Sequence, residues 1–484
     1  MTRLSAREIA HRALGRLVGD ETSLVDSWAF DSRALAPGAC FVALRDARDG
    51  HDFVEAAFDA GATVALVDDD FAPPRRVDPG HALVHVGDPL GALQEVARSL
   101  RLDRPELHVV AVGGSTGKTS TKDLLAAALA SEGCYANAES YNNEFGLPIT
   151  LCNAPDSARV VVTEMGERFA GDLRALCEIA RPDTGLVTNA GLAHAEHLGG
   201  REGVVAVLSE LMEALPGTGV AVLNADDPAT RALTAATLAE VVTVGESEAA
   251  DYRITDVTLD GRQRPSFLLE GHRFRVPLHG RHQAWNAAMA IAVARRVFSV
   301  PLETIADSLE ATTPGRWRME LLETASGVTI LNDAYNANPA SMWAALVTLR
   351  RIELRAGARR IAVLGDMREL GAHHDEEHRI VGERAAELGI DVVVGVGAGG
   401  AVIAEAARTG GVDTHPVADA AEAIGLVATF VQPGDAVLVK GSRALGLERV
   451  ADGLLASDDT GGHPGGHPGG HAGSSGRCGG GDRP

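Results

Sequence analysis

Residues 108–122 read HVVAVGGSTGKTSTK, and this stretch decides the class of fold. The apolar run up to Val112 predicts a buried strand, the glycines after it predict a tight turn, and the residues from about Thr119 predict a helix. A glycine-rich turn between a strand and a helix directs backbone N–H groups and the positive helix end at one point, which suits phosphate. Lys118 would neutralise phosphate charge there, and the Thr119 hydroxyl would bind Mg²⁺. The strict phosphate-loop pattern has a glycine where this chain has Val112, so an ordinary glycine-rich turn is the alternative.

Strands and helices alternate on both sides of this loop. Apolar segments that end in polar turns recur through the centre and the last third of the chain, which predicts parallel sheets covered by helices on both faces. We therefore expect an α/β protein with a small mixed α/β N-terminal domain, a central P-loop ATP-binding domain with a parallel sheet, and a C-terminal Rossmann-like α/β domain. The expected boundaries are 1–105, 106–314 and 315–457, followed at 458–484 by a Gly/His/Pro tail that we expect to be disordered.

The composition is that of a globular protein with an acidic surface. Of 484 residues, 45% are hydrophobic, and 66 acidic against 44 basic residues give a net charge of −22. This charge argues against nucleic acid or an anionic membrane surface as a partner, and we expect no membrane span. The 5 cysteines are scattered without a CxxC pair, which excludes a disulfide scaffold or a zinc ribbon. We expect a cytoplasmic monomer that acts on small molecules.

Polar side chains follow two predicted strands of the central region. Glu164 ends one strand, and His194 follows the next strand and loop. Ligands of open α/β sheets gather at such strand ends, so these side chains suit contacts with Mg²⁺ and phosphate. The alternative, a carboxylate that ends a strand and an ordinary surface histidine, stays open. For Asp226 and Asp227, which also follow a strand, we expect a helix cap.

Two polar segments follow strands of the last third. The run NDAYNANPAS places Asp333, Asn336 and Asn338 ahead of a proline, either as a loop directed at a ligand or as an Asx-rich turn. The run VKGSR places Lys440 and Arg443 at a strand end. These cations suit a carboxylate ligand, and a solvated basic turn is the alternative.

Taken together, the motifs resemble those of the Mur ligase family, ATP-dependent amide ligases of peptidoglycan precursor synthesis. The resemblance covers about residues 25 to 455. The matching segments are DSR at 31–33, GGSTGKTSTKD at 113–123, YNNEFGLPIT at 141–150, TEMG at 163–166, TNAGLAHAEHLG at 188–199, HGRHQAWNA at 279–287, GRWRME at 315–320, NDAYNANPASM at 332–342, VLGDMREL at 363–370 and VKGSR at 439–443. The series from GRWRME to VKGSR is specific, whereas the phosphate loop alone would not be.

The resemblance implies a reaction that consumes ATP with Mg²⁺ as cofactor. The carboxylate of a UDP-N-acetylmuramoyl-tripeptide becomes an acyl phosphate, which the amine of D-alanyl-D-alanine attacks. Catalytic roles are implied for Lys118, Glu164, His194 and Arg316, and Mg²⁺ binding for Thr119, Glu164 and His194. ATP contacts are implied for Gly114, Ser115, Thr116, Gly117, Lys118, Thr119, Ser120, Asn286 and Asp333. Substrate contacts are implied for Ser32, Arg33, Asn142, Asn143, Asn336, Asn338, Lys440 and Arg443.

One position departs from the family pattern. The family usually carries a lysine after the TN…AH segment, and its carbamate helps to hold a second Mg²⁺. Leu208 stands there in this chain, and no lysine occurs between Lys122 and Lys440. Glu210 is a poor substitute, because two residues correspond to about 200° around a helix. Two alternatives stay open: a related ligase with another acid or amine substrate, and a nucleotide-binding protein without activity.

The tail carries three histidines at a spacing of four residues. An imidazole set could bind Zn²⁺ or Ni²⁺ weakly, although the interspersed proline and glycine prevent a helix that would align the rings. We favour a flexible tail without a specific ligand. The three residues are His463, His467 and His471.

Overall fold

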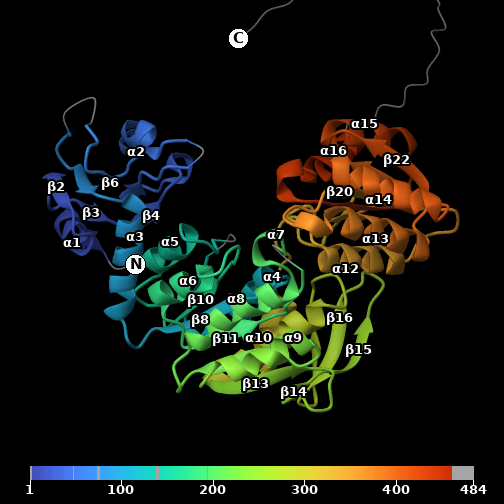
Figure 1. Cartoon of the computed structure of the whole chain (residues 1–484), viewed down its shortest axis with the longest axis horizontal. Coiled ribbons are helices and arrows are strands. Elements are labelled where there is room, and N and C mark those ends of the chain that lie inside the picture. Colours follow the sequence, from blue (N-terminus) through green and yellow to red (C-terminus); the bar gives the residue numbers. More distant parts are fainter. Residues whose placement is uncertain (1–2, 47, 73–76, 138–140, 193–194, 460–484) are drawn as a thin grey trace, which may run out of the picture.

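The computed structural model describes residues 3–46, 48–72, 77–137, 141–192 and 195–459. Three α/β regions follow one another along the chain, each built on its own main sheet (Figure 1). Helices lie against these sheets, as the alternation of strands and helices predicts. None of the described helices combines the length and the apolar character needed to cross a membrane.

The N-terminal region is a mixed sheet in the order β2-β7-β6-β5-β4, in which only β2 runs antiparallel to its neighbour. A separate antiparallel pair joins β1 and β3. The strands are β1 (Leu4–Ser5), β2 (Arg16–Gly19), β3 (Leu24–Val25), β4 (Ser27–Ala29), β5 (Ala39–Val42), β6 (Val64–Asp68) and β7 (Ala82–Val86), and the helices are α1 (Ala6–Arg12), α2 (Val54–Asp59) and α3 (Pro89–Leu102).

The apolar residues at the N-terminus recur at helical spacing, which predicts a helix over Leu4, Ile9, Ala13, Leu14 and Leu17. The first helix is shorter than this. It ends at Arg12, and Ala13 forms its C-cap. Leu14 then adopts a φ of 53° with 89% of its surface exposed, and Leu17 lies in β2. The helical spacing of apolar residues therefore extends past the end of the helix by coincidence. Leu14 is exposed in a turn, and Leu17 belongs to a strand.

The central region is a parallel seven-stranded sheet in the order β14-β13-β12-β11-β8-β10-β9, with a small antiparallel sheet of β15, β16 and β17 beside it. Its strands are β8 (His108–Gly113), β9 (Cys134–Ala136), β10 (Val160–Glu164), β11 (Thr184–Val187), β12 (Val220–Asn224), β13 (Glu240–Gly245), β14 (Tyr252–Arg253), β15 (Thr255–Leu259), β16 (Pro265–Leu269) and β17 (His272–Arg275). Its helices are α4 (Lys118–Ala128), α5 (Gly146–Asn153), α6 (Asp172–Ala180), α7 (Ala195–Leu198), α8 (Arg201–Glu213), α9 (Pro228–Ala232), α10 (Gln283–Phe298) and α11 (Leu302–Glu310).

The N-terminal and central regions are joined through β4 and α5. The backbone N–H of Trp28 donates to Oδ1 of Asn153 at 2.8 Å, and Nδ2 of Asn153 donates to the carbonyl of Trp28 at 3.0 Å. Apolar side chains of α3, α5 and α6 belong to one continuous core that also includes strands of both sheets.

The C-terminal region is a six-stranded sheet in the order β18-β19-β23-β20-β21-β22. The sequence predicts a parallel unit, and the structure differs at one edge, where β18 runs antiparallel to β19. The strands are β18 (Glu320–Glu323), β19 (Thr329–Asn332), β20 (Arg360–Gly365), β21 (Val392–Val396), β22 (Asp413–Val417) and β23 (Ala436–Lys440), and the helices are α12 (Pro339–Arg351), α13 (His374–Glu387), α14 (Gly397–Thr409), α15 (Ala420–Phe430) and α16 (Glu448–Asp459).

Candidate active site

A cavity of about 1380 Å³ lies between the central and C-terminal regions. Its walls include the loops that follow β8, β10 and β11, the start of α10, and the loops that follow β19 and β23. Strands β11, β8 and β10 are parallel neighbours, so their carboxyl ends open on one edge of the sheet. Ligands of open α/β sheets bind at such edges.

The glycine-rich loop after β8 is held in shape by the loop after β11. The backbone N–H of Ser115 donates to the carbonyl of Asn189 at 3.0 Å, and that of Thr116 donates to Asn189 Oδ1 at 3.2 Å. Gly114 has a φ of 121°, and a Cβ there would lie 2.3 Å from the hydroxyl of Thr188. Only glycine fits this position, so the loop keeps its backbone close to the neighbouring strand.

Helix α4 begins directly at this loop. Its N-cap is Gly117, which has no side chain of its own to cap the first turn. The start of a helix directs backbone N–H groups and its positive end at an anion. The first turn also carries Lys118, Thr119 and Ser120, all of which line the cavity.

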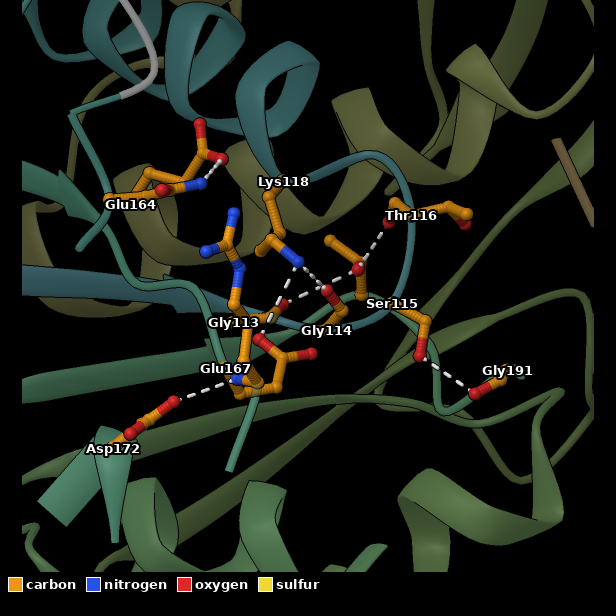
Figure 2. A network of polar contacts seen from close by, with 12 residues as sticks. Gly113, Gly114, Ser115, Thr116, Lys118, Glu164, Glu167, Asp172 and Gly191 are labelled. Carbon is orange, nitrogen blue, oxygen red and sulfur yellow. Dashed lines mark hydrogen bonds and ion pairs between the residues drawn. The ribbon is translucent and has the colours of Figure 1, made fainter. Parts of the chain in front are cut away.

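The side chain of Lys118 folds back over the glycine-rich loop. Its ammonium group donates to the carbonyl of Gly114 and lies 3.5 Å from Oε2 of Glu167 (Figure 2). The cation is held at the point where the loop and the start of α4 converge. Phosphate that binds to the loop would meet this charge first.

Glu164 is the buried carboxylate at the end of β10. Its Oε2 accepts a hydrogen bond from the hydroxyl of Thr119 at 2.6 Å, and its Oε1 accepts one from Nδ2 of Asn142 at 2.7 Å. A carboxylate and a hydroxyl offer hard oxygen ligands, which are those that Mg²⁺ prefers. The residues present therefore fit a Mg²⁺ ion beside the phosphate loop.

Asn286 packs on the phosphate loop from α10. It is 6% exposed, and its Nδ2 donates to Oε1 of Gln283 at 2.9 Å. A Cβ on Gly117 would lie 2.7 Å from Asn286 Oδ1, so this amide covers the second loop glycine. Asn286 lines the cavity, and an adenine contact stays a prediction.

Asp333 and Lys440 are a charged pair on the wall of the cavity that the C-terminal region supplies. The Lys440 ammonium lies 2.6 Å from Asp333 Oδ2 and donates to the carbonyl of Asn336 at 2.8 Å. The backbone N–H of Met319 donates to Asp333 Oδ1 at 3.0 Å. Lys440 is therefore already paired within its own domain.

His282 lines the same cavity close to this pair. Burial lowers the pKa of its imidazole to about 4, the neighbouring Asp333 acts in the opposite direction, and Lys440 lowers it further. The ring is therefore neutral at pH 7, where it can accept a hydrogen bond from a ligand.

Asn338 connects the two walls of the cavity. It is the N-cap of α12, where its Oδ1 accepts from the backbone N–H of Ser341 at 2.9 Å. Its Nδ2 donates across the cavity to the carbonyl of Ser115 at 3.5 Å. The C-terminal domain thus touches the phosphate loop through the start of one helix.

Two arginines lie against the ring of Trp317. The guanidinium carbons of Arg316 and Arg443 are 5.0 and 4.3 Å from the ring centre, and Arg443 also pairs with Glu448 at 2.8 Å. Arg443 is among the residues that line the cavity, whereas Arg318 lines it instead of Arg316. The sequence did not single out Arg318, although it lies two residues along the same motif.

The remaining predicted site residues are dispersed. Asn142 and Asn143 line the cavity. Ser32 and Arg33 lie outside it in the N-terminal region, where Arg33 pairs with Asp31 and holds the pKa of that carboxyl at about 2. His194, which was predicted to bind Mg²⁺, lies outside the described residues. The three histidines of the tail, His463, His467 and His471, also lie outside them.

The two aspartates after β12 have separate roles. Asp227 is the N-cap of α9, where its Oδ1 accepts from the backbone N–H of Ala229 at 3.0 Å, so the predicted cap is confirmed for this residue. Asp226 Oδ2 instead accepts from the indole N–H of Trp285 at 2.7 Å.

Helix α8 carries Leu208 into the protein core. Leu208 is fully buried, and its Cδ2 would lie 3.7 Å from a Cβ on Gly113, at the start of the phosphate loop. Glu210 points elsewhere: its carboxylate accepts from the backbone N–H groups of Gly171 and Arg174 at 2.7 and 3.1 Å. Glu210 therefore caps the start of α6.

Several residues of this cavity were not singled out by sequence reasoning, and three of them besides Arg318 bear on the site. Asn189 braces the loop, His282 stands near the ion pair, and Glu167 faces Lys118. Glu167 could have been noticed as an acidic residue three positions after Glu164. Asn189 and His282 lie within the matching segments at 188–199 and 279–287, but their contacts depend on which strand ends the fold brings together.

The comparisons with known proteins agree with this geometry. Residues 112–294 match the model of the Mur ligase middle domain, and residues 317–443 match that of the Mur ligase glutamate ligase domain. The chain belongs to the Mur ligase family. This Mur ligase is 39% identical over 498 residues to the UDP-N-acetylmuramoyl-tripeptide–D-alanyl-D-alanine ligase of Mycobacterium tuberculosis, covering 95% of this chain and 96% of that enzyme. It is 33% identical to the enzyme of that name from Bacillus subtilis, covering 94% and 99%.

Solved structures give the same result over most of the chain. This Mur ligase is similar to MurF from Acinetobacter baumannii, with a TM-score of 0.81 at 28% identity, covering 94% of this chain and 99% of that one. It is also similar to MurF from Thermotoga maritima in complex with ADP, with a TM-score of 0.74 at 27% identity, covering 90% and 98%. The predicted three-region α/β fold is confirmed.

Proposed function

We propose that this Mur ligase joins D-alanyl-D-alanine to UDP-N-acetylmuramoyl-tripeptide at the expense of ATP. The observation that carries the proposal is the full-length match to relatives of that name, 95% of this chain against 96% of the Mycobacterium tuberculosis enzyme. The phosphate loop, which lines a cavity shared by two domains, supports it.

The reaction needs two successive displacements. A carboxylate oxygen of the tripeptide attacks the γ-phosphorus of ATP, the bond to the β-phosphate oxygen breaks, and ADP leaves. The amine of the dipeptide then attacks the acyl carbon, phosphate leaves, and the amine proton is released to solvent. Both steps depend on neutralising charge and excluding water more than on covalent help from the protein.

The phosphate loop supplies this neutralisation. The N–H groups at the start of α4 bind phosphate oxygens, and Lys118 turns toward the phosphates. Thr119 and Glu164 would hold Mg²⁺, which when bound neutralises phosphate charge and orients the γ-phosphate for attack. Glu164 keeps its orientation because Asn142 donates to its second oxygen.

The opposite wall positions the acceptor substrates. Asn336 and Lys440 lie at strand ends that face the loop, and Asn338 already touches Ser115 across the cavity. We place the incoming dipeptide between this wall and the γ-phosphate. Arg443 offers a cation for its carboxylate, because guanidinium groups bind carboxylates in a bidentate manner.

Ser32 and Arg33 are proposed to bind the uridine nucleotide. Arg33 is exposed in the N-terminal region, so an anionic ligand can reach it. Arg316 is proposed to approach ATP from the C-terminal region, and Asn286 and Asp333 to contact its adenosine part. We further propose a monomer in the cytoplasm; the cytoplasmic location agrees with four described cysteines that remain thiols.

A second candidate function is amide ligation of a different acid or amine. Leu208 favours it, because a leucine cannot carry the carbamate that the family places there. The third alternative, nucleotide binding without turnover, is disfavoured by the intact set of Lys118, Thr119 and Glu164.

The test is phosphate release from ATP and Mg²⁺ with the UDP-linked tripeptide and D-alanyl-D-alanine. We expect release that requires both substrates, is lost in Lys118→Met, and is retained in Arg159→Gln, which removes an exposed cation paired with Glu132. ADP binding without release would reject the proposal for these substrates. Release with another acid or amine would then support the second candidate.

A further inference from the structure

Arg368 is an arginine of the cavity wall that the proposed mechanism does not use. It lies in the loop after β20, is exposed, and lines the cavity from the C-terminal region. Within the part of the chain that the structure describes, no carboxylate forms an ion pair with its guanidinium group. A guanidinium group offers N–H donors in a planar fork that matches the two oxygens of a carboxylate.

The backbone around Arg368 is fixed by hydrogen bonds to two neighbouring elements. The N–H of Met367 donates to Nε2 of the buried His378 at 2.8 Å. The N–H of Arg368 donates to the hydroxyl of Ser442 at 3.0 Å, and the N–H of Ser442 donates to the carbonyl of Asp366 at 3.0 Å. A side chain on a backbone held in this way loses less conformational freedom when it binds a ligand.

The next residue of the loop is strained and contacts the central region. Glu369 has a φ of 62°, in the left-handed region, and its carbonyl accepts from the N–H of Glu196 in α7 at 3.1 Å. Such backbone strain persists only where the surrounding structure holds it, and it clusters at ligand sites. The loop that carries Arg368 is therefore held by both the C-terminal and the central region.

Two cations at the neighbouring strand end are already paired. Strand β23 lies beside β20 and ends at Lys440, whose ammonium nitrogen is 2.6 Å from Asp333. Arg443 follows in the same loop and is 2.8 Å from Glu448. The charge of these two side chains is compensated before a substrate binds, whereas that of Arg368 is not.

We propose that Arg368 determines the specificity for the amine substrate by binding the free carboxylate of the incoming dipeptide. This inference rests on the proposed function, which places the dipeptide between this wall and the γ-phosphate. Arg443 can share the carboxylate from the loop after β23, and Arg368 supplies the uncompensated charge. An amine substrate without a free carboxylate leaves the guanidinium group unpaired and loses a charge-assisted contact.

Phosphate release with two amine substrates tests the proposal, at saturating ATP, Mg²⁺ and UDP-linked tripeptide. The amines are D-alanyl-D-alanine and D-alanyl-D-alaninamide, which differ only at the carboxylate. For the native protein we expect kcat/KM to be about tenfold or more higher with the free acid, because hydrogen bonds to charged groups contribute about 1.5–3 kcal/mol. Arg368→Gln should raise the KM for the free acid by the same factor and leave the KM for the amide unchanged.

Further variants separate charge from geometry and from general effects of losing an arginine. Arg368→Lys keeps the charge without the planar fork and should recover part of the preference for the free acid. Arg408→Gln removes an exposed arginine of the same region, paired with Glu405 at 2.6 Å, and should keep the full preference. Thermal unfolding of each variant shows whether the fold is retained.

The outcomes distinguish this inference from the proposed function. Equal kcat/KM of the native protein for the two amines, or a preference retained in Arg368→Gln, would overturn the role of Arg368 and leave the proposed function intact. A KM raised equally for both amines would show a structural role only. Loss of the preference in Arg443→Gln but not in Arg368→Gln would assign the carboxylate to Arg443 alone. No phosphate release by the native protein with either amine would reject the proposed function, and this inference with it.

Discussion

The ammonium nitrogen of Lys440 lies 2.6 Å from Oδ2 of Asp333, across the parallel strands β23 and β19. The side chain of Lys440 is 2% exposed and that of Asp333 is 13% exposed. This pair links two strand ends at the wall of the cavity that faces the phosphate loop. A buried pair of this kind is strongly destabilised when one partner is removed.

Removal of either partner should therefore destabilise the protein. We expect Lys440→Met and Asp333→Asn each to lower the free energy of unfolding by about 3–5 kcal/mol, because the remaining charge stays buried. The free energy of unfolding of the double variant should fall by clearly less than the sum of the two single losses. Urea denaturation of the four proteins measures this coupling, and additive losses would contradict it.

Glu210 should stabilise the protein as a helix cap. Its carboxylate accepts two backbone N–H groups at the start of α6, so Glu210→Gln should lower the free energy of unfolding by about 1–3 kcal/mol. Glu213→Gln on the same helix, where the side chain is 53% exposed, should change it by less than about 0.5 kcal/mol. If urea denaturation gave the same small loss of free energy of unfolding for Glu210→Gln as for Glu213→Gln, the cap would contribute nothing to stability.

Leu208 should not accept a charged side chain. The residue is fully buried in an apolar core, so Leu208→Lys should lower the free energy of unfolding by about 3 kcal/mol or more, while Leu208→Met should cost less than about 1.5 kcal/mol. Thermal and urea unfolding measure both. A lysine tolerated as well as methionine would mean that this side chain reaches the polar cavity.

His282 should make stability depend on pH. Burial lowers the pKa of the folded imidazole from 6.5 to about 4, so between these values the unfolded chain takes up a proton that the folded protein does not. Stability should fall by about 3 kcal/mol relative to His282→Asn as the pH drops from 7 to 4, and the difference should be constant above pH 7.

Urea denaturation at several pH values measures this difference. His272→Gln, on the edge strand β17, controls for the loss of a histidine in general. A difference between native protein and His282→Asn that does not change with pH would contradict the lowered pKa of this imidazole.

Local sequence was sufficient for the elements that bind phosphate. The apolar run before the loop, the glycines and the start of the following helix lie within the fifteen residues 108–122, and their backbone preferences act over that distance. The helical spacing at the N-terminus was misleading beyond Arg12, because Leu14 is exposed in a turn. The antiparallel edge strand β18 was not predictable either, since pairing depends on the neighbour that the fold supplies.

The sequence by itself determined the fold class, the phosphate loop and the family, because each depends on residue types at short and ordered spacings. Only the tertiary structure decided which charges meet. It paired Lys440 with Asp333, used Glu210 as a cap and set Glu167 against Lys118, residues that lie 107, 39 and 49 positions from their partners. The physical reason is that the energy of a buried charge depends on the groups around it, and packing of distant strands and helices chooses those groups.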